Sequence, residues 1–290
     1  TEIYTLVYTL SLQTLFRSPI VGSVGMFVLL AGFAFLLNGA DFGTTLMVAG
    51  GLITVLMLVG WFGTVIRENR QGVYHDREDM SFRWGMGWFI FSEVMFFAAF
   101  FGALFYARTL AIPWLAGSGA EEWTHTWLWP SFEAAWPSNG PGAVGGQFEA
   151  MGAWGLPALN TLILLSSGVT VTWAHWGIKQ GNQRQQVLGL AATVVLGLLF
   201  VAFQAYEYAE AYGHMNLTLG TGIYGSTFYM LTGFHGLHVT VGAIMLAVML
   251  ARALAGHFSP DNHFAFEAAA WYWHFVDVVW LGLFIFVYWL

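Results

Sequence analysis

The sequence predicts an all-α integral membrane protein that crosses the bilayer with seven transmembrane helices. Hydrophobic residues make up 58% of the chain and charged residues only 9%, whereas soluble domains carry about 25% charged residues. The apolar runs are long enough to cross a hydrocarbon core of about 30 Å as helices, and they are too long for the strands of a membrane barrel. These runs place the helices at about 19–37, 44–66, 82–106, 157–178, 187–209, 224–252 and 264–290.

The first two helices follow a short amphipathic segment, residues 1–18, for which a separate surface helix is expected. Pro19 then opens the first span, because proline is tolerated in the first turn of a helix. The Asn-Gly pair at 38–39 favours a tight turn before the second span. A polar segment rich in charged residues, 67–81, follows that span.

The third helix carries a carboxylic acid, Glu93, near its middle. An ionised carboxylate is costly at that depth, so such an acid is normally protonated or faces protein or a wet cavity. Two interpretations stay open at this point. Glu93 either takes part in proton handling, or it is a neutral carboxyl hydrogen-bonded to the next helix.

A long loop is expected between the third and fourth helices, at 107–155. It is rich in glycine, proline and tryptophan, and Arg108 is its only arginine or lysine. A loop of this length is either functional or a partner contact, or else it is a solvated cover over the bundle. Its acidic residues are Glu121, Glu122, Glu133 and Glu149.

The basic residues predict the orientation of the chain. With a cytoplasmic N-terminus, every arginine and lysine except Arg108 falls on the inner side. This asymmetry matches the positive-inside rule. We therefore expect the long loop and the C-terminus on the outer side of the membrane.

Two histidines, His235 and His238, lie three residues apart near the middle of the sixth helix. This spacing could hold a metal or a haem. A buried haem, however, usually needs facing histidines from two helices, and a metal needs three or four ligands. The other histidines of the spans, His175 and His274, cannot be placed opposite the pair from the sequence. The alternative is that these histidines bridge helices through hydrogen bonds.

Polar residues also recur on one face of the seventh helix, where Glu267, His274 and Asp277 follow at intervals of seven and three. Such a face should point into protein rather than lipid. The simplest interpretation is an interhelix polar network. A second polar face is expected at the outer end of the fifth helix, formed by Gln204, Glu207 and Glu210.

The composition excludes several classes of site. The chain has no cysteine, which excludes disulfides, cysteine-ligated iron–sulfur clusters and a cysteine-held copper centre within it. Its nine arginines and lysines form no cluster, so nucleic-acid binding is not expected.

An ordered set of motifs closely resembles subunit III of cytochrome c oxidase, a member of the haem–copper oxidase complexes. The resemblance is strong over the third to seventh helices and is carried in the first two mainly by VIRE at 65–68. The other motifs are FSEV at 91–94, LNT at 159–161, TWAH at 172–175, QAYEY at 204–208, YGSTF at 224–228, TGFHGLHV at 232–239 and HFAFEAAAWYWHFVDVVW at 263–280.

The resemblance implies two helix bundles around a V-shaped lipid cleft. Residues 1–80 would hold the first two helices and their inner loop, and residues 81–290 the five-helix bundle with the outer loop. It also implies a non-catalytic core subunit of an oxygen-reducing, proton-translocating complex. Such a chain has no catalytic residue, metal or redox cofactor of its own. It packs mainly on oxidase subunit I, with subunit II also present, and haem a and copper belong to these partners.

Particular residues match the family's functional positions. Glu93 matches the carbodiimide-reactive glutamate, so we expect it to be protonated and accessible from the lipid or the cleft. In the family this subunit supports proton uptake into subunit I and protects the complex during turnover. The family's phospholipid head-group contacts map onto Trp61, Glu68, His75 and Arg252.

The sequence departs from the family at four places. Residues 174–176 read AHW where the family commonly has two adjacent histidines, and residues 262–263 read NH, which keeps one of two histidines. Residues 61–64 read WFGT, where the family often has two tryptophans and an Arg-Asp pair. The 107–155 loop is longer than usual, which suggests contact with another subunit or a supercomplex partner.

Three alternatives remain from the sequence. A quinol oxidase subunit III is close in kind, but such relatives typically lack the first two helices. A stand-alone membrane proton channel or transporter would use Glu93 and the acids of the seventh helix, yet no internal repeat supports it. A haem-binding oxidoreductase would use His235 and His238. We expect a bacterial inner membrane location, with the mitochondrial inner membrane as the alternative.

Overall fold

The computed structural model describes residues 2–119 and 122–290, which form helices joined by turns and loops. Within this part of the chain, seven helices are long and apolar enough to cross a membrane. The predicted all-α membrane class is therefore confirmed. Glu121 of the predicted acidic loop lies outside the described residues.

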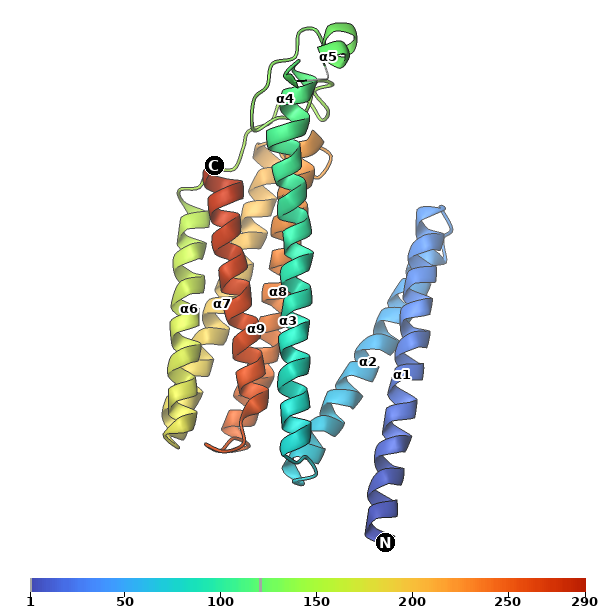
Figure 1. Cartoon of the computed structure of the whole chain (residues 1–290), viewed down its shortest axis with the longest axis vertical. Coiled ribbons are helices and arrows are strands. Elements are labelled where there is room, and N and C mark those ends of the chain that lie inside the picture. Colours follow the sequence, from blue (N-terminus) through green and yellow to red (C-terminus); the bar gives the residue numbers. More distant parts are fainter. Residues whose placement is uncertain (1, 120–121) are drawn as a thin grey trace. The chain divides into compact units, whose positions relative to one another are not determined.

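The chain divides into two compact units, Thr1–Glu78 and Asp79–Leu290. The first unit contains α1 (Glu2–Leu37) and α2 (Gly43–Arg70), which pack along each other (Figure 1). A Cβ on Gly50 would lie 2.3 Å from the backbone nitrogen of Leu29, and one on Gly32 would lie 2.4 Å from that of Met47. These glycines therefore allow the close backbone approach that is typical of membrane helix pairs.

The first candidate membrane span, Pro19–Leu37, has the predicted bounds. The separate surface helix expected before Pro19 is wrong, because α1 runs through this residue. Proline removes one amide donor from the helix. Membrane helices tolerate this loss, since local adjustments and neighbouring groups satisfy the freed carbonyl. A proline at the start of an apolar run is therefore a weak signal for a helix start in this class of protein.

The second unit is a helix bundle. In Figure 1, α6, α7, α8 and α9 lie side by side, and α6 also packs on α9. The helix α3 rests on α8 and α9 through aromatic rings: the centroid of Phe97 lies 5.0 Å from that of His238 and 6.0 Å from that of Phe275. The elements are α3 (Asp76–Tyr106), η1 (Ala107–Ala111), α4 (Ile112–Leu115), α5 (Glu122–Leu128), α6 (Leu156–Lys179), α7 (Gln183–His214), α8 (Gly222–Leu254), α9 (Phe264–Leu283) and η3 (Phe284–Trp289).

Two tryptophans of α9 anchor the centre of this bundle. Trp273 and Trp280 are fully buried. Their indole N–H groups donate to hydroxyls of α6, from Trp273 to Ser167 at 2.8 Å and from Trp280 to Thr161 at 2.9 Å. A buried indole N–H needs such a partner, so each tryptophan fixes the position of α9 against α6 as well as filling the core.

The predicted start of the long loop at residue 107 is wrong. Helical structure continues from α3 through the wide turn η1 to the end of α4 at Leu115, and the following segment contains the short helix α5. The helix α7 is likewise longer than predicted at both ends; Asn182 caps its start by accepting from the Gln185 amide at 3.1 Å. Apolar length marks only the part of a helix within hydrocarbon, and these helices extend beyond it into polar sequence.

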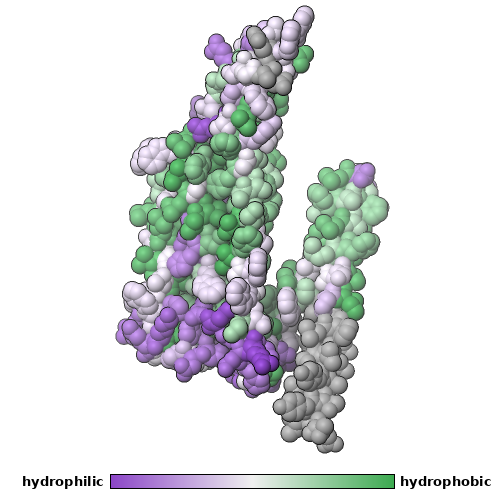
Figure 2. Space-filling model, viewed as in Figure 1, coloured by the Kyte–Doolittle hydropathy of each residue, from purple (hydrophilic) through white to green (hydrophobic). Residues whose placement is uncertain are grey.

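Hydropathy along the second unit follows the pattern of a membrane bundle. On the face shown in Figure 2, hydrophobic side chains cover the middle of the bundle and hydrophilic ones gather at one end. Large apolar side chains such as Trp84, Trp88 and Val169 are more than 60% exposed. Exposure of this kind is expected where lipid, rather than water, surrounds the protein.

Candidate functional site

The central polar contact joins α3 to α8. Oε2 of Glu93 lies 3.0 Å from Nε2 of His238, and Nδ1 of the same ring lies 2.6 Å from the carbonyl oxygen of Phe234. A carbonyl only accepts hydrogen bonds, so Nδ1 carries a hydrogen. The contact between Nε2 and the carboxyl oxygen therefore requires one more proton, held either by Glu93 or by His238.

Aromatic rings surround the His238 side of this contact. The imidazole of His238 lies 5.0 Å from the ring of Phe97, 5.9 Å from that of Phe96 and 6.3 Å from that of Tyr272, measured between centroids. The side chain of Glu93 is 22% exposed and that of His238 is 13% exposed. The pair is thus mostly enclosed by apolar surface, while the carboxyl retains a route to the outside of the chain.

His235 makes a different contact from His238, although both belong to α8. It is fully buried, with Nε2 3.2 Å from the carbonyl oxygen of Val276 in α9. Its ring packs against those of Phe200 and Trp280, with centroids 5.6 and 5.0 Å away. The two histidines do not converge on a common ligand position, so the geometry favours helix bridging over the haem hypothesis.

A second polar group lies where α6 ends and α9 begins. The carboxylate of Glu267 in α9 contacts Arg83 of α3, and its Oε1 lies 3.2 Å from Nε2 of His263 and 3.6 Å from Nε2 of His175. Arg83 in turn pairs with Asp79 through Nε at 2.7 Å. Glu267 is the one member of this group that the sequence predicted as a site residue.

The other two members of the predicted seventh-helix network lie apart from Glu267. Nδ1 of His274 is 3.4 Å from Oδ2 of Asp277, and Nε2 of His274 is 3.3 Å from the hydroxyl of Thr172 in α6. Asp277 is buried as expected, but 46% of the His274 side chain is exposed. Within this chain, Asp277 therefore faces the bundle and His274 lies at its surface, so the prediction that the whole face points into protein stays a prediction.

The three polar residues predicted to share one face near the end of α7 do not all lie on a buried face. Glu207 is fully buried and accepts a hydrogen bond from the hydroxyl of Tyr288 at 2.7 Å, and Gln204 is buried beside it, whereas Glu210 is exposed. A spacing of three residues drifts around a helix by 60° per step, so the third member of such a series leaves the buried face.

Three of the predicted lipid contacts, Trp61, Glu68 and His75, belong to the first unit. Trp61 is 48% exposed and stacks on Phe62. Glu68 accepts a hydrogen bond from the hydroxyl of Tyr74 at 2.6 Å, and the backbone amide of His75 donates to Glu78 at 3.0 Å. Burial, together with the neighbouring Glu68 carboxylate, holds the pKa of Tyr74 well above its usual value.

A cavity of about 400 Å³ lies at the end of α2 in the same unit. It is lined by Gly63, Ile66, Arg67, Arg70 and Gln71. Two arginines beside one cavity suit an anionic group, because a guanidinium pairs readily with phosphate oxygens. The sequence named Glu68 of this segment as a lipid contact and also placed its arginines at the inner interface, where a cation can meet a lipid phosphate.

The fourth predicted lipid contact, Arg252, lies near the end of α8. It is only 7% exposed within this chain, and its guanidinium carbon lies 4.7 Å above the ring of Phe258. The sequence predicted that Arg252 contacts lipid at the membrane interface. It did not predict that the side chain is buried within the chain.

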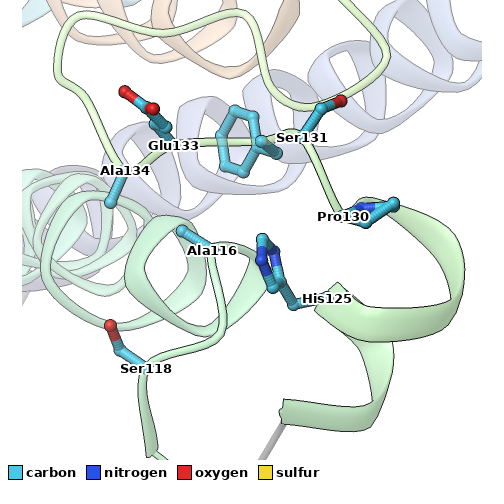
Figure 3. Close-up of a pocket in the computed structure, with 8 residues that line it drawn as sticks. Ala116, Ser118, His125, Pro130, Ser131, Glu133 and Ala134 are labelled. Atoms are coloured by element: carbon cyan, nitrogen blue, oxygen red, sulfur yellow. The ribbon is translucent and has the colours of Figure 1, made fainter.

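The segment after α4 contains a further cavity, of about 410 Å³ (Figure 3). His125 lines it together with Ser131, Phe132 and Glu133, and the carboxylate of Glu133 is directed away from the imidazole. Nδ1 of His125 lies 3.2 Å from the carbonyl oxygen of Leu115, so this nitrogen is already engaged. His125 and Glu133 therefore do not act together on a ligand in this cavity as it stands.

The fold and these contacts define a multi-pass helical membrane protein whose polar side chains meet across helices. Comparison with known proteins agrees with this class. The family model for cytochrome c oxidase subunit III matches residues 9–290. The chain therefore belongs to the cytochrome c oxidase subunit III family.

Individual relatives cover almost the whole chain. The cytochrome c oxidase subunit 3 of Drosophila melanogaster is 43% identical over 274 residues, which is 93% of this chain and 92% of the relative. That of Danio rerio is 41% identical over 272 residues, 93% of each chain. That of Marchantia polymorpha is 44% identical over 275 residues, 93% of this chain and 92% of the relative. Membership of this family implies assembly with other oxidase subunits.

Proposed function

We propose that the chain is the non-catalytic core subunit III of a proton-pumping terminal cytochrome c oxidase, in which it stabilises subunit I and supports proton uptake. Family membership supports the complex to which it belongs. The contact between Glu93 and His238 is the observation that supports a role in proton uptake within that complex. It is an acid–base pair holding a proton inside a membrane span.

The acid–base pair suits a supporting role for three physical reasons. The carboxyl is partly exposed, so it can exchange its proton with a group outside this chain. The aromatic rings around His238 exclude bulk water from that side of the pair. Both possible positions of the proton preserve the hydrogen bond, so transfer between Glu93 and His238 needs no movement of either helix.

Electron transfer, in this proposal, belongs to the partner subunits. Haem a and copper would lie outside this chain, in partner subunits, with subunit I as the main contact. The different directions in which His235 and His238 point support this assignment, because neither is paired with a facing histidine as a buried haem usually requires. The outer segment within 107–155 would contact another subunit or a supercomplex partner.

Phospholipid binding forms a further part of the proposal. In the first unit, Trp61, Glu68 and His75 lie on or beside α2, whose end also carries the cavity lined by Arg67 and Arg70. In the second unit, Arg252 lies near the end of α8. Arginines close to helix ends can meet lipid phosphates at the membrane interface. The membrane concerned would be a bacterial inner membrane, or a mitochondrial one as the alternative.

The test replaces Glu93 by glutamine in the assembled oxidase, with Glu210→Gln as the matched control. Glu210 is an exposed glutamate of α7. Carbodiimide labelling of this subunit should disappear in Glu93→Gln and persist in Glu210→Gln. The initial rate of oxygen reduction should change by less than tenfold, which is less than about 1.4 kcal/mol in the barrier.

A complete loss of electron transfer in Glu93→Gln, with haem and subunit content unchanged, would contradict the supporting role. Undiminished carbodiimide labelling in the same variant would show that another carboxyl is the reactive one.

A further inference from the structure

We propose that His175, His263 and Glu267 form a binding site for a divalent metal ion of the zinc type, at the end of the bundle where α6 finishes and α9 begins. The sequence alone predicted no metal in this chain. The three residues come from α6, from the turn before α9 and from α9 itself. One ligand atom from each lies within 4.8 Å of the others.

The spacing of the ligand atoms fits a tetrahedral ion. Zinc binds histidine nitrogen and carboxylate oxygen at about 2.0–2.2 Å, so two ligand atoms of a tetrahedral site lie about 3.3–3.6 Å apart. Oε1 of Glu267 lies 3.2 Å from Nε2 of His263 and 3.6 Å from Nε2 of His175.

The hydrogen-bond pattern of His263 supports a cation at this point. Its Nδ1 lies 3.0 Å from the carbonyl oxygen of Ser259 and must therefore carry a hydrogen. Its Nε2, and that of His175, are both buried without a hydrogen-bond partner. In a neutral imidazole, Nε2 of His263 then presents a lone pair to a carboxylate oxygen, which is repulsive unless a positive charge lies between them.

A metal ion between Nε2 of His263 and the carboxylate would remove this repulsion. The contact from Nδ1 of His263 to the carbonyl oxygen of Ser259 would be kept when the ion binds. Histidines that bind metals almost always donate their other ring N–H to a carbonyl or carboxylate, which fixes the tautomer and the direction of the ring. The contact from His263 to Ser259 has this form. The side chains of His263 and Glu267 are 10% and 14% exposed, so the site is sheltered but open to solution.

The charges around Glu267 leave one carboxylate oxygen for the ion. Arg83 contacts Oε2, whereas the histidines face Oε1. Arg83 opposes a cation, and Lys179 at the end of α6 adds to this effect. Asp79 offsets part of the opposing charge through its own contact with Arg83. We therefore expect a site weaker than a fully structural zinc site.

The donor set indicates the kind of ion. Two imidazoles and one carboxylate are the ligands of several zinc sites, in which water takes the fourth position. Calcium and magnesium prefer oxygen ligands and would bind poorly here. A bound zinc ion would link α6 to the turn that precedes α9, at the end of the bundle that the basic residues predict to be cytoplasmic.

The experiment measures zinc binding to the purified full-length chain in detergent by equilibrium dialysis with radioactive zinc. The variants are His175→Gln and His263→Gln. His274→Gln serves as the matched control, because His274 belongs to α9 but lies outside the cluster. Calcium serves as the control ion.

The wild-type chain should bind one equivalent of zinc per chain at sub-millimolar concentration. Each cluster variant should bind at least about tenfold more weakly, His274→Gln should match the wild type, and calcium should not compete. Absence of a stoichiometric zinc site in the wild type would overturn the proposal without reference to any variant. Equal zinc affinity in the wild type and both cluster variants would also overturn the proposal. The three residues would then be explained by ion pairs between protonated histidine and Glu267. The outcome is independent of oxidase activity, so it does not test the proposed function.

Discussion

The Glu93–His238 pair is the clearest case, at the scale of single residues, of what the sequence could and could not predict. The position of Glu93 within an apolar run identifies it as a costly and therefore informative acid. Its partner follows 145 residues later, from another helix. No local spacing encodes that distance, so the sequence left hydrogen bonding and proton handling as separate alternatives. The contact between Glu93 and His238 is compatible with both alternatives, and proton handling stays a prediction.

The cluster around Glu267 was only partly predicted for the same reason. Glu267 belongs to a periodic series on α9, which identified it. His175 and His263 are separated by 88 residues (263 − 175) and come from different elements. Each is a single histidine near a helix end, and such residues show no pattern until the fold brings them together.

Tyr74 provides a pH-dependent prediction outside the membrane spans. Burial and Glu68 raise the pKa of its hydroxyl, so above a pH of about 10 the unfolded chain loses this proton before the folded chain does. The unfolded state then binds fewer protons, and the free energy of unfolding falls as pH rises. Glu68→Gln should lower the pKa of Tyr74, because the neighbouring charge is removed while the burial remains.

The phenolate absorbance of the wild type minus that of Tyr74→Phe, recorded against pH, measures this shift. A Tyr74 that ionises at the same pH with and without Glu68 would show that the hydrogen bond between them does not form.

At the scale of helices, the hydrophobic pattern predicted the number and approximate positions of the spans but not their ends. Polar residues at both ends of α7 are helical, and helical structure continues after α3 past Arg108 to Leu115. A long arginine side chain can reach the interface from within a helix. A charged residue therefore marks the edge of the hydrocarbon and not the end of the helix.

Close packing of α1 on α2 gives a prediction at this scale. A methyl group on Gly50 would lie 2.3 Å from the backbone of Leu29, so Gly50→Ala must push the two helices apart. Overpacking of this kind typically costs about 1–3 kcal/mol. Unfolding of the full chain in detergent, titrated with a denaturing detergent, measures the change.

Gly60→Ala is the control on the same helix. A Cβ at Gly60 would have no neighbour within 4 Å. This variant should be neutral or more stable, because alanine favours helix over glycine by about 1 kcal/mol. If both variants behaved alike, the close approach of α1 and α2 would be refuted.

At the scale of the whole molecule, composition alone predicted the class of protein, and the ordered motifs predicted the family. The arrangement of the two units around a lipid cleft stays a prediction. So does the orientation in the membrane, which depends on the distribution of arginine and lysine. The arrangement of the units and the orientation in the membrane depend on contacts with partner subunits and lipid, and not only on packing within the chain.

The orientation can be tested directly because the chain has no cysteine. Ser118→Cys, in the outer segment, should react with a membrane-impermeant maleimide added from outside. Gln180→Cys, in the turn after α6, should react only after the membrane is opened; both residues are exposed. The reverse pattern would place the N-terminus outside and contradict the positive-inside prediction.

The central claim is that this chain is a subunit of a haem–copper oxidase and holds no haem itself. The most direct measurement is the reduced-minus-oxidised spectrum of the C-terminally tagged chain, purified in mild detergent, before and after its partners are stripped away. Our account predicts haem a in the first spectrum and none in the second. A haem spectrum that stays with the stripped chain, or a chain that purifies without partners and without haem, would contradict it.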